Sequence, residues 1–430
     1  MRDALHGLTT RGRSFVAAGV ALLVASAITA EKDLLRIAVL VLALPVLSAV
    51  VVARTRYRLS SGRRLGSPRT AAGQESTVTL RLDNISRLPT GLLLVEDRVP
   101  YVLGSRPRFV LDRVEPRGRR EVTYSVRSEV RGRYQLGPMS LRLTDPFGMC
   151  ELQRAFSARD TLVVTPAVQD LPAVALSGDW TGTGESRSRS IASAGEDDAG
   201  TREYHQGDDL RRVHWRSTAR LGQLMVRREE QPWQARCTLL LDTRSRAHGG
   251  EGPGSSFEWA VSAAASVGVH LVRNGYSVRL LTDTGAPVAG GELSLDGASS
   301  DVEGTLLDAL SVITSSGNAS LRHAGSALRR GGTGGVLVAV LGTVDPEETR
   351  LLARLRHGST AAVAIALDTA TWTGARASAD RTAFDGSVAL LEASGWRVVT
   401  VRAGDALPDL WEGASRHRVA PTSPAAAGVS

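Results

Sequence analysis

The chain of 430 residues has 42% hydrophobic residues and a net charge of +8, from 52 lysines and arginines against 44 acidic residues. This length and balance predict about three globular domains and exclude a wholly disordered chain. Lys32 is the only lysine, so 51 of the 52 basic residues are arginine. A Walker-type phosphate loop and a Schiff-base enzyme both need a lysine within the site, and the rest of the chain has none to offer. The arginine bias accompanies abundant Ala and Gly and is typical of coding bias, so we expect no nucleic-acid partner.

Two uncharged apolar runs near the start of the chain predict a membrane hairpin. Residues 14–30 and 37–53 form runs of 17 residues each, which is the short end of what crosses a bilayer as a helix. Arginines precede the first run and follow the second, so the positive-inside rule places both termini in the cytoplasm. We therefore expect residues 1–54 to anchor the chain in the plasma membrane as a two-pass hairpin. Two alternatives stay open, namely a cleaved signal peptide or a pair of buried core helices in a soluble domain.

Period-two alternation of apolar and polar residues predicts a β domain over residues 55–165. The alternation is clearest at residues 77–82, 119–126 and 140–144, and turns are expected at Asp83-Asn84, Arg131-Gly132 and Asp145-Pro146. Short strands at this spacing are typical of an antiparallel, immunoglobulin-like sandwich. Residues 54–165 also hold 21 arginines against 11 acidic residues, a net charge of +10. Such charge beside a membrane attracts anionic lipid, although arginines at solvent-facing strand positions would give the same count.

Residues 166–235 contain a linker and then the densest run of functional side chains. Residues 178–200 are rich in Gly, Ser and charge and are typical of a loop. The four arginines at 211, 212, 216 and 220 suit bidentate binding of a carboxylate or phosphate. A helix over residues 209–216 would place Arg212 and Arg216 on one face, with Asp208 or Asp209 as its N-cap. The candidate binding residues are Tyr204, Gly207, Asp208, Asp209, Arg211, Arg212, His214, Trp215, Arg216 and Arg220.

The same run has a purely structural interpretation. Asp208, Arg211 and Arg216 would then form an internal ion-pair network, while Tyr204 and Trp215 would be packing residues. A zinc site built on His205 and His214 is disfavoured, because their nine-residue separation and the lack of a second ligand cluster do not match zinc spacing.

Residues 202–230, REYHQGDDLRRVHWRSTARLGQLMVRREE, resemble the hallmark segment of the domain-of-unknown-function 58 family. RGRYQLGP at residues 131–138 and DPFGM at residues 145–149 resemble its upstream signature. The resemblance implies a hairpin, a β domain, the hallmark and then a von Willebrand factor type A-like domain. Family members are typically encoded beside MoxR-type AAA+ ATPases and transglutaminase-like membrane proteins, which implies a partner or adaptor role.

Residues 236–415 predict an α/β domain with a mainly parallel sheet covered on both faces. A helical stretch is expected at residues 257–273, and further helical patterns separate the strands. A disordered tail over residues 416–430 follows. The expected strands are residues 236–242, 277–282, 336–341, 361–367 and 397–401.

Asp242 follows the first of these strands, where the type A-like fold implied by the resemblance carries a DxSxS metal motif. Here Arg244 and Arg246 replace both serines, and a guanidinium cannot coordinate a divalent cation. We therefore predict no Mg²⁺ at this position and no cofactor. Asp242 is left to pair with Arg244 or Arg246, or to cap the following turn.

The leading functional hypothesis is a membrane-anchored, non-enzymatic scaffold that docks a MoxR-type AAA+ ATPase and other membrane proteins of the same gene cluster. The alternative is a sensor of anions or membrane lipid that uses the arginine-rich β domain and the hallmark. An enzyme is disfavoured, because the sequence offers no nucleophile–base pair, metal cluster or cofactor loop.

Overall fold

A computed structural model of the chain forms two compact units, residues Met1–Pro166 and Ala167–Ser430, and each is considered by itself. The expected loop at 178–200, the tail at 416–430 and hallmark residues 205–212 lie outside the described residues, as do the expected turn at Asp145-Pro146 and residues 331–334. The structure describes residues 7–54, 59–87, 89–90, 92–144, 147–174, 201–204, 213–227, 236–286, 301–330, 335–356, 361–374 and 378–414.

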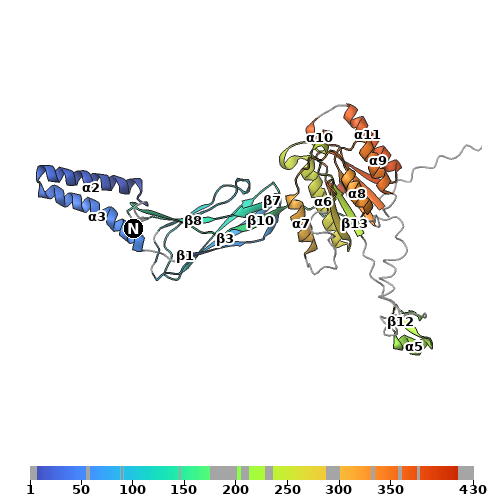
Figure 1. Cartoon of the computed structure of the whole chain (residues 1–430), viewed down its shortest axis with the longest axis horizontal. Helices are drawn as coiled ribbons and strands as arrows, with labels where there is room; N and C mark the ends of the chain where they lie inside the picture. The colour runs from blue at the N-terminus through green and yellow to red at the C-terminus, as the bar shows by residue number, and fades with distance from the viewer. Residues whose placement is uncertain are drawn as a thin grey trace, which may run out of the picture. The chain divides into compact units, whose positions relative to one another are not determined.

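The first unit begins with two helices, α2 (Thr10–Thr29) and α3 (Lys32–Arg54), which pack along each other (Figure 1). Both are long and apolar enough to cross a membrane, and only 17% of each apolar window is buried, which disfavours core helices of a soluble domain. The helices start earlier than expected and leave a tighter turn. Thr9 caps α2 by accepting from the amide of Gly12, and Ala30 ends it in the left-handed region at φ 55°.

Among its described residues, the first unit continues with ten strands that enclose a hydrophobic core. They form the sheets β1-β3-β6, β5-β4-β8-β9 and β2-β10-β7, and every pairing is antiparallel except that of β10 with β2. Buried side chains alternate along β3, which is the physical basis of the period-two pattern. The strands are β1 (Leu59–Leu65), β2 (Arg69–Ala71), β3 (Glu75–Asn84), β4 (Leu93–Asp97), β5 (Arg108–Leu111), β6 (Arg119–Arg127), β7 (Gly132–Leu136), β8 (Met139–Thr144), β9 (Glu151–Ala155) and β10 (Asp160–Thr165).

The expectation of antiparallel strands in this region is confirmed, but the turn expected at Asp83-Asn84 is wrong. Both residues belong to β3, where Asn84 lies opposite Leu59 of β1. The buried Asn84 amide also donates to the carbonyl of Val114 at 3.2 Å, so a residue common in turns here extends a strand.

The second unit contains a small motif of two strands and a helix, formed by β11 (Thr201–Glu203), α5 (Trp215–Leu221) and β12 (Met225–Arg227). The two strands pair antiparallel, and Val213 makes a further bridge to Val226. This motif carries the described part of the hallmark.

The rest of the second unit is a five-stranded parallel sheet with helices on both faces, as expected (Figure 1). Its strands are β13 (Arg236–Leu241), β14 (Ser277–Thr282), β15 (Val336–Leu341), β16 (Ala361–Leu367) and β17 (Arg397–Val401), in the order β14-β13-β15-β16-β17. One face packs against α6 (Ser256–Arg273), α7 (Val302–Val312) and α12 (Leu407–Trp411). The other packs against α8 (Arg322–Arg330), α9 (Pro346–Leu355) and α11 (Ser378–Ala393), and the short α10 (Ala370–Thr373) follows β16.

Candidate functional site at the carboxyl edge of the parallel sheet

The carboxyl ends of the parallel strands bring three aspartates to one edge of the sheet. Asp242 follows β13, Asp283 follows β14 and Asp368 follows β16, and all three are buried. In this strand order β14 and β15 flank β13 on opposite sides, so the direction of the chain along the sheet reverses at β13. Ligands of doubly wound folds bind in the crevice outside such a reversal, so this edge is the candidate site.

The guanidinium of Arg244 fills the space beside Asp242. Its Nε lies 2.9 Å from Oδ1 of Asp242, and its Nη2 lies 2.8 Å from Oδ2. Nη1 donates to Oε1 of Glu348 in α9, and Nη2 also donates to the carbonyl of Thr343 at 3.2 Å. Burial lowers the pKa of Arg244, but the bonds and charges of the two carboxylates outweigh burial and raise it above its ordinary value. Of the partners that the sequence left open for Asp242, the structure selects Arg244.

A second arginine forms the outer layer of this network. Arg246 Nη2 lies 3.1 Å from Oε1 of Glu348 and 3.5 Å from Oδ2 of Asp345, and its side chain is 51% exposed. Asp345 and Glu348 also cap α9 reciprocally, because each carboxylate accepts from the other residue's backbone amide, at 2.9 and 3.1 Å. Both Glu348 oxygens are thereby occupied. Among the described residues, no three His, Cys, Asp or Glu side chains gather as a metal-binding group.

Asp283 holds the neighbouring part of the edge with neutral donors. Its Oδ1 accepts from the amide and hydroxyl of Thr243, and its Oδ2 accepts from Ser316 at 2.6 Å and Asn318 at 2.8 Å. Burial alone raises the pKa of Asp283, but the hydrogen bonds from Ser316, Thr243 and Asn318 outweigh burial and lower the pKa. Asp283 is therefore a buried carboxylate that stays ionised and connects β14 to the loop after α7.

His248 fixes the loop that carries the two arginines. Its Nε2 lies 2.8 Å from the carbonyl oxygen of Asp242, so Nε2 carries the proton, and Nδ1 accepts from Ser256 Oγ at 3.2 Å. Burial lowers the pKa of His248 more than the nearby Asp242 raises it. This Ser–His contact is structural, because Ser256 is fully buried and its Oγ already accepts from the amide of Gly249 at 2.9 Å.

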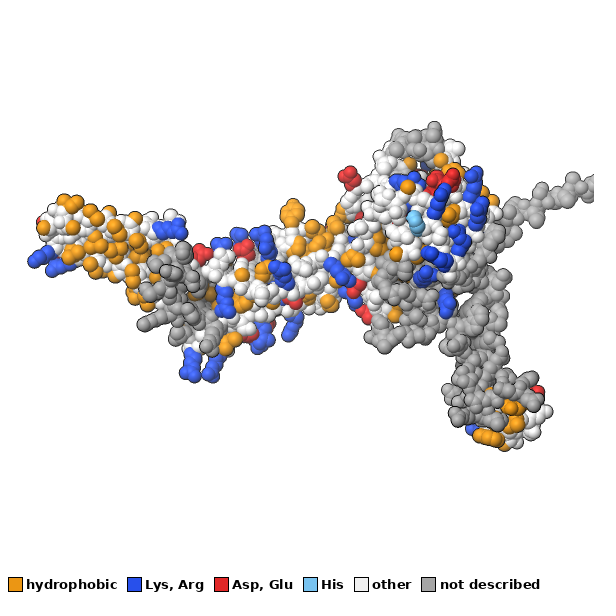
Figure 2. Space-filling model, in the orientation of Figure 1, with side chains coloured by type: hydrophobic (Ala, Val, Ile, Leu, Met, Phe, Trp, Pro, Cys, Tyr) orange, Lys and Arg blue, Asp and Glu red, His pale blue; other side chains and the backbone are white. Residues whose placement is uncertain are grey.

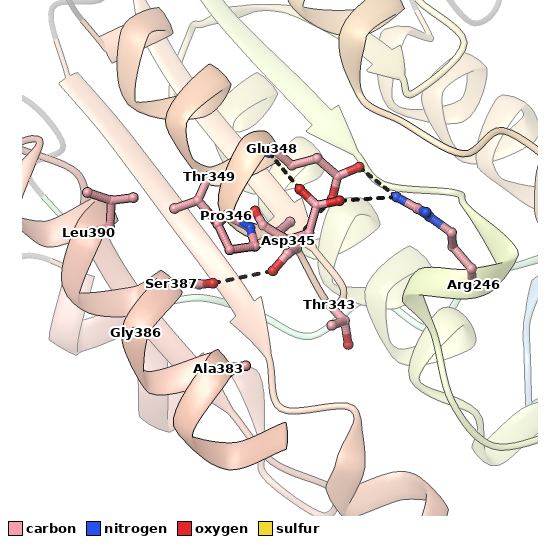
Figure 3. Close-up of a pocket in the computed structure, with 11 residues that line it drawn as sticks. Arg246, Thr343, Asp345, Pro346, Glu348, Thr349, Ala383, Gly386, Ser387 and Leu390 are labelled. Carbon is pink, nitrogen blue, oxygen red and sulfur yellow. Dashed lines mark hydrogen bonds and ion pairs between the residues drawn. The ribbon is translucent and has the colours of Figure 1, made fainter. Parts of the chain in front are cut away.

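A cavity of about 610 Å³ adjoins the network where α9 begins beside α11 (Figure 3). Arg246 and Leu390 lie on opposite sides of it, with Asp345 and Glu348 between them. Its charged lining residues are Arg246, Asp345 and Glu348, which already bond to one another. The lining residues are Arg246, Thr343, Val344, Asp345, Pro346, Glu348, Thr349, Ala383, Gly386, Ser387 and Leu390.

The hallmark residues lie on the small motif of β11, α5 and β12, and the structure describes five of the ten candidates. The amide of Tyr204 donates to the carbonyl of Leu224 at 2.8 Å. Arg216 and Arg220 lie in α5. Trp215, at the first position of α5, is 70% exposed. Of the two interpretations left open for Trp215, a packing role does not fit this exposure. Gly207, Asp208, Asp209, Arg211 and Arg212 lie outside the described residues.

A continuous helix over residues 209–216, which the sequence suggested as one possibility, does not form at its described end. Val213 makes a β-bridge, and α5 starts only at Trp215 because His214 is its N-cap. The Nδ1 atom of His214 accepts from the amide of Ser217 at 3.3 Å and lies 2.8 Å from the Ser217 hydroxyl. Histidine is an unusual N-cap, so the usual preference for Asp pointed to the wrong residue.

Several residues of the edge were not identified from the sequence. The signal for Glu348 was readable, since Asp345-Pro346-Glu347-Glu348 is a capping box with proline at the first helical position. Asp283 follows a predicted strand and had the same signal as Asp242. No sequence signal joins Arg244 to Glu348, which lies 104 residues later.

The 131–138 signature contributes to the core of the β domain. The carbonyl of Leu136 accepts from Nη1 of the buried Arg63 at 3.0 Å, and Nη2 of Arg63 donates to Asp97 at 2.6 Å. Tyr124 also donates to Asp97, at 2.7 Å. This part of the resemblance therefore marks a structural network.

Comparisons with known proteins identify one family. Residues 200–297 match the family model described as "Protein of unknown function DUF58". No protein with a curated description matches the chain.

Several solved structures match about a quarter of the chain. They include the CARDB domain of PF1109 from Pyrococcus furiosus (13% identity, 25% of this chain and 93% of that chain, TM-score 0.19). The putative ApaA protein from Bordetella pertussis matches at 13% identity over 25% of this chain and 94% of that chain, with a TM-score of 0.20. A chain from the complex of zinc 2-glycoprotein and prolactin inducible protein from human seminal plasma matches at 9% identity over 26% of this chain and 97% of that chain, with a TM-score of 0.20. Likeness at these TM-scores carries no argument about fold or function.

Proposed function

Because this chain belongs to the DUF58 family through residues 200–297, we propose that it is a membrane-anchored, non-enzymatic scaffold or adaptor. In this proposal α2 and α3 cross the plasma membrane, and both termini, the β domain and the second unit lie on the cytoplasmic side. The β domain is an immunoglobulin-like sandwich, and the parallel-sheet domain is a von Willebrand factor type A-like fold. The partners are a MoxR-type AAA+ ATPase and other membrane proteins of the same gene cluster.

The observation that supports a scaffold over an enzyme is the occupied edge of the parallel sheet. The reversal between β13 and β15 is the usual ligand position of such a fold, and Arg244 lies there with Asp242 and Glu348 as its partners. A ligand at this position would have to displace a fully buried cation from two carboxylates, which is costly. The edge thus acts as a rigid support for the surfaces around it.

The hallmark supplies the docking surface of this proposal. Trp215 exposes 70% of its surface on α5, and exposed tryptophans are enriched among residues that dominate binding at protein interfaces. Arg216 and Arg220 on the same short helix add donors suited to acidic groups of a partner.

Pull-down of a MoxR-type ATPase from the same organism by the full-length protein in detergent tests the proposal. Trp215→Ala should weaken capture at least tenfold, since hot-spot truncations cost about 2 kcal/mol or more. Tyr101→Ala is a matched control, because Tyr101 is an aromatic residue of the β domain that is 95% exposed. Failure of the wild-type protein to retain the ATPase contradicts the proposed partner. Equal capture by wild type and Trp215→Ala removes the hallmark as the docking surface.

The alternative function, sensing of anions or membrane lipid, is favoured by the net charge of +10 on residues 54–165. Basic residues next to a membrane contribute about 1 kcal/mol each to binding of anionic lipid. Salt-sensitive binding of the full-length protein to vesicles with phosphatidylglycerol supports this function. Binding that is insensitive to both salt and anionic lipid excludes it.

A further inference from the structure

We propose that Phe147 and the first turn of α2 form one lipid-facing surface, which holds the end of the β domain in the headgroup layer of an anionic membrane. The surface consists of Arg11, Arg13 and Phe147 and is called the interfacial patch below. This inference rests on the proposed membrane anchoring, and it adds that the β domain itself touches the bilayer.

The β domain is attached directly to the start of α2. The amide of Thr9 donates to the carbonyl of Met149 at 2.9 Å, and the Thr9 hydroxyl donates to the carbonyl of Gly148 at 2.7 Å. The amide of Glu151 donates to Gly7 at 2.7 Å, and Leu8 pairs with Cys150 in an antiparallel bridge. These bonds extend the β9 strand by a short piece of chain that leads straight into the helix.

The contact is close enough to leave no room for a side chain on the helix. A Cβ placed on Gly12 would lie 2.4 Å from the carbonyl oxygen of Met149, so the helix backbone packs on the loop. Gly148 has a φ of +68° and turns the loop beneath Arg11, whose Nη1 would lie 3.8 Å from a Cβ at that position. The loop at 147–150 therefore has a defined position relative to the first turn of α2.

The length of α2 sets the depth of this loop. The 20 residues of α2 span about 30 Å, which equals the thickness of the hydrocarbon core of a bilayer. Because Arg11 and Arg13 are charged, the uncharged run that begins at residue 14 lies in the hydrocarbon, and the first turn of α2 from Thr10 on lies at headgroup depth. Because the loop is hydrogen-bonded to Thr9, residues 147–150 lie at headgroup depth.

The side chains at this depth have the chemistry of a membrane interface. Phe147 is 54% exposed, and Arg11 and Arg13 are exposed in the first turn of α2. Phenylalanine side chains of surfaces that lie on a membrane bury at the boundary between headgroups and acyl chains, and arginines there bind anionic headgroups. Figure 2 shows basic side chains, with acidic ones among them, on the β domain near its junction with the helices.

The test places an environment-sensitive NBD label at position 147 of the full-length protein. Phe147→Cys is labelled and reconstituted into vesicles of phosphatidylcholine and phosphatidylglycerol; the native Cys150 and Cys237 are buried. Tyr101→Cys is the matched control, since Tyr101 is 95% exposed. Tyr101 follows Asp97 of β4, which pairs with Met139 at the start of β8, whereas the loop at 147–150 follows the end of β8. Circular dichroism of both labelled proteins checks that they are folded.

The expected result is a blue-shifted label at position 147 that is severalfold less quenched by aqueous iodide than the label at position 101, and is quenched by lipids that carry a shallow nitroxide. Removing phosphatidylglycerol, or combining the labelled variant with Arg11→Gln and Arg13→Gln, should reduce this protection. Equal iodide quenching at both positions in protein that floats with the vesicles overturns the interfacial patch and leaves the anchor intact. Protein that fails to float at all overturns the membrane anchoring itself.

Discussion

Arg244 and Asp242 form a bidentate pair with no exposure to solvent, at 2.9 and 2.8 Å, between residues only two apart in the chain. The amide of Arg244 also donates to Oδ1 of the same aspartate at 3.1 Å. One carboxylate thus fixes both the backbone and the side chain of the residue that occupies the edge of the sheet. The pair is local, while its connection to Glu348 joins the ends of β13 and β15.

Arg244→Met should lower the free energy of unfolding by about 3–5 kcal/mol, because it leaves Asp242 and Glu348 as uncompensated buried carboxylates. Arg246→Met makes the same change at a side chain that is 51% exposed, and it should cost no more than about 1 kcal/mol. Urea unfolding of the full-length protein in detergent, followed by tryptophan fluorescence, measures both. Equal losses of unfolding free energy for the two variants would contradict the conclusion that Arg244 neutralises the buried carboxylates.

Asp283 should make the second unit sensitive to strong acid. Its folded pKa lies below its ordinary value of 3.8, so the stabilisation is fully present above that pH and is lost as the pH falls through the folded pKa. As the pH is lowered from 4, Asp283→Asn should therefore lose less stability than the wild-type protein does. Asp170→Asn, at a side chain that is 95% exposed, is the control and should follow wild type. An equal loss of stability in acid for wild type and Asp283→Asn would contradict the stabilising role of the hydrogen bonds to Asp283.

His248 should act in a separate, milder pH window. Burial holds its folded pKa below the ordinary value of 6.5, so the unfolded chain takes up the proton first and stability declines as the pH drops below about 6.5. His248→Gln should flatten this part of the profile. His323→Gln, at an exposed position in α8, should leave it unchanged. A wild-type stability that stays constant between pH 7 and 5 would contradict the predicted effect of His248.

Gly12→Val should separate the loop at 147–150 from α2, because even a Cβ at this position would lie 2.4 Å from the carbonyl oxygen of Met149. Hydrogen exchange of the Thr9 and Glu151 amides should accelerate by at least tenfold, since the variant releases the bonds that protect them. Gly62→Ala, where an added Cβ meets nothing within 4 Å, is the control. Unchanged protection in Gly12→Val would show that the contact does not hold these amides.

The sheet of the second unit was predictable because buried parallel strands are continuous apolar runs. Residues 277–282, 336–341, 361–367 and 397–401 are strands with the predicted bounds. Helix ends were less predictable, since the caps at Thr9 and His214 depend on hydrogen bonds that apolar periodicity does not encode.

The candidate site was predictable only where its members are close in sequence. Asp242, Arg244 and Arg246 lie within five consecutive residues, so a pairing of Asp242 with one of the arginines could be predicted from the sequence. The partnership with Glu348 is set by the crossing of the chain from β13 to β15 and has no local signal. The position of Trp215 could not be inferred either, because a large aromatic residue is more often packed than exposed.

The bridge between Leu8 and Cys150 has a mechanical consequence. Only residues 55–58 separate α3 from β1, so α3 is joined to the β domain by the chain itself. The start of α2 is joined to the β domain by hydrogen bonds. A single tether would let the domain swivel about its attachment, whereas two attachments resist torque. A pull on the β domain is therefore shared between both helices.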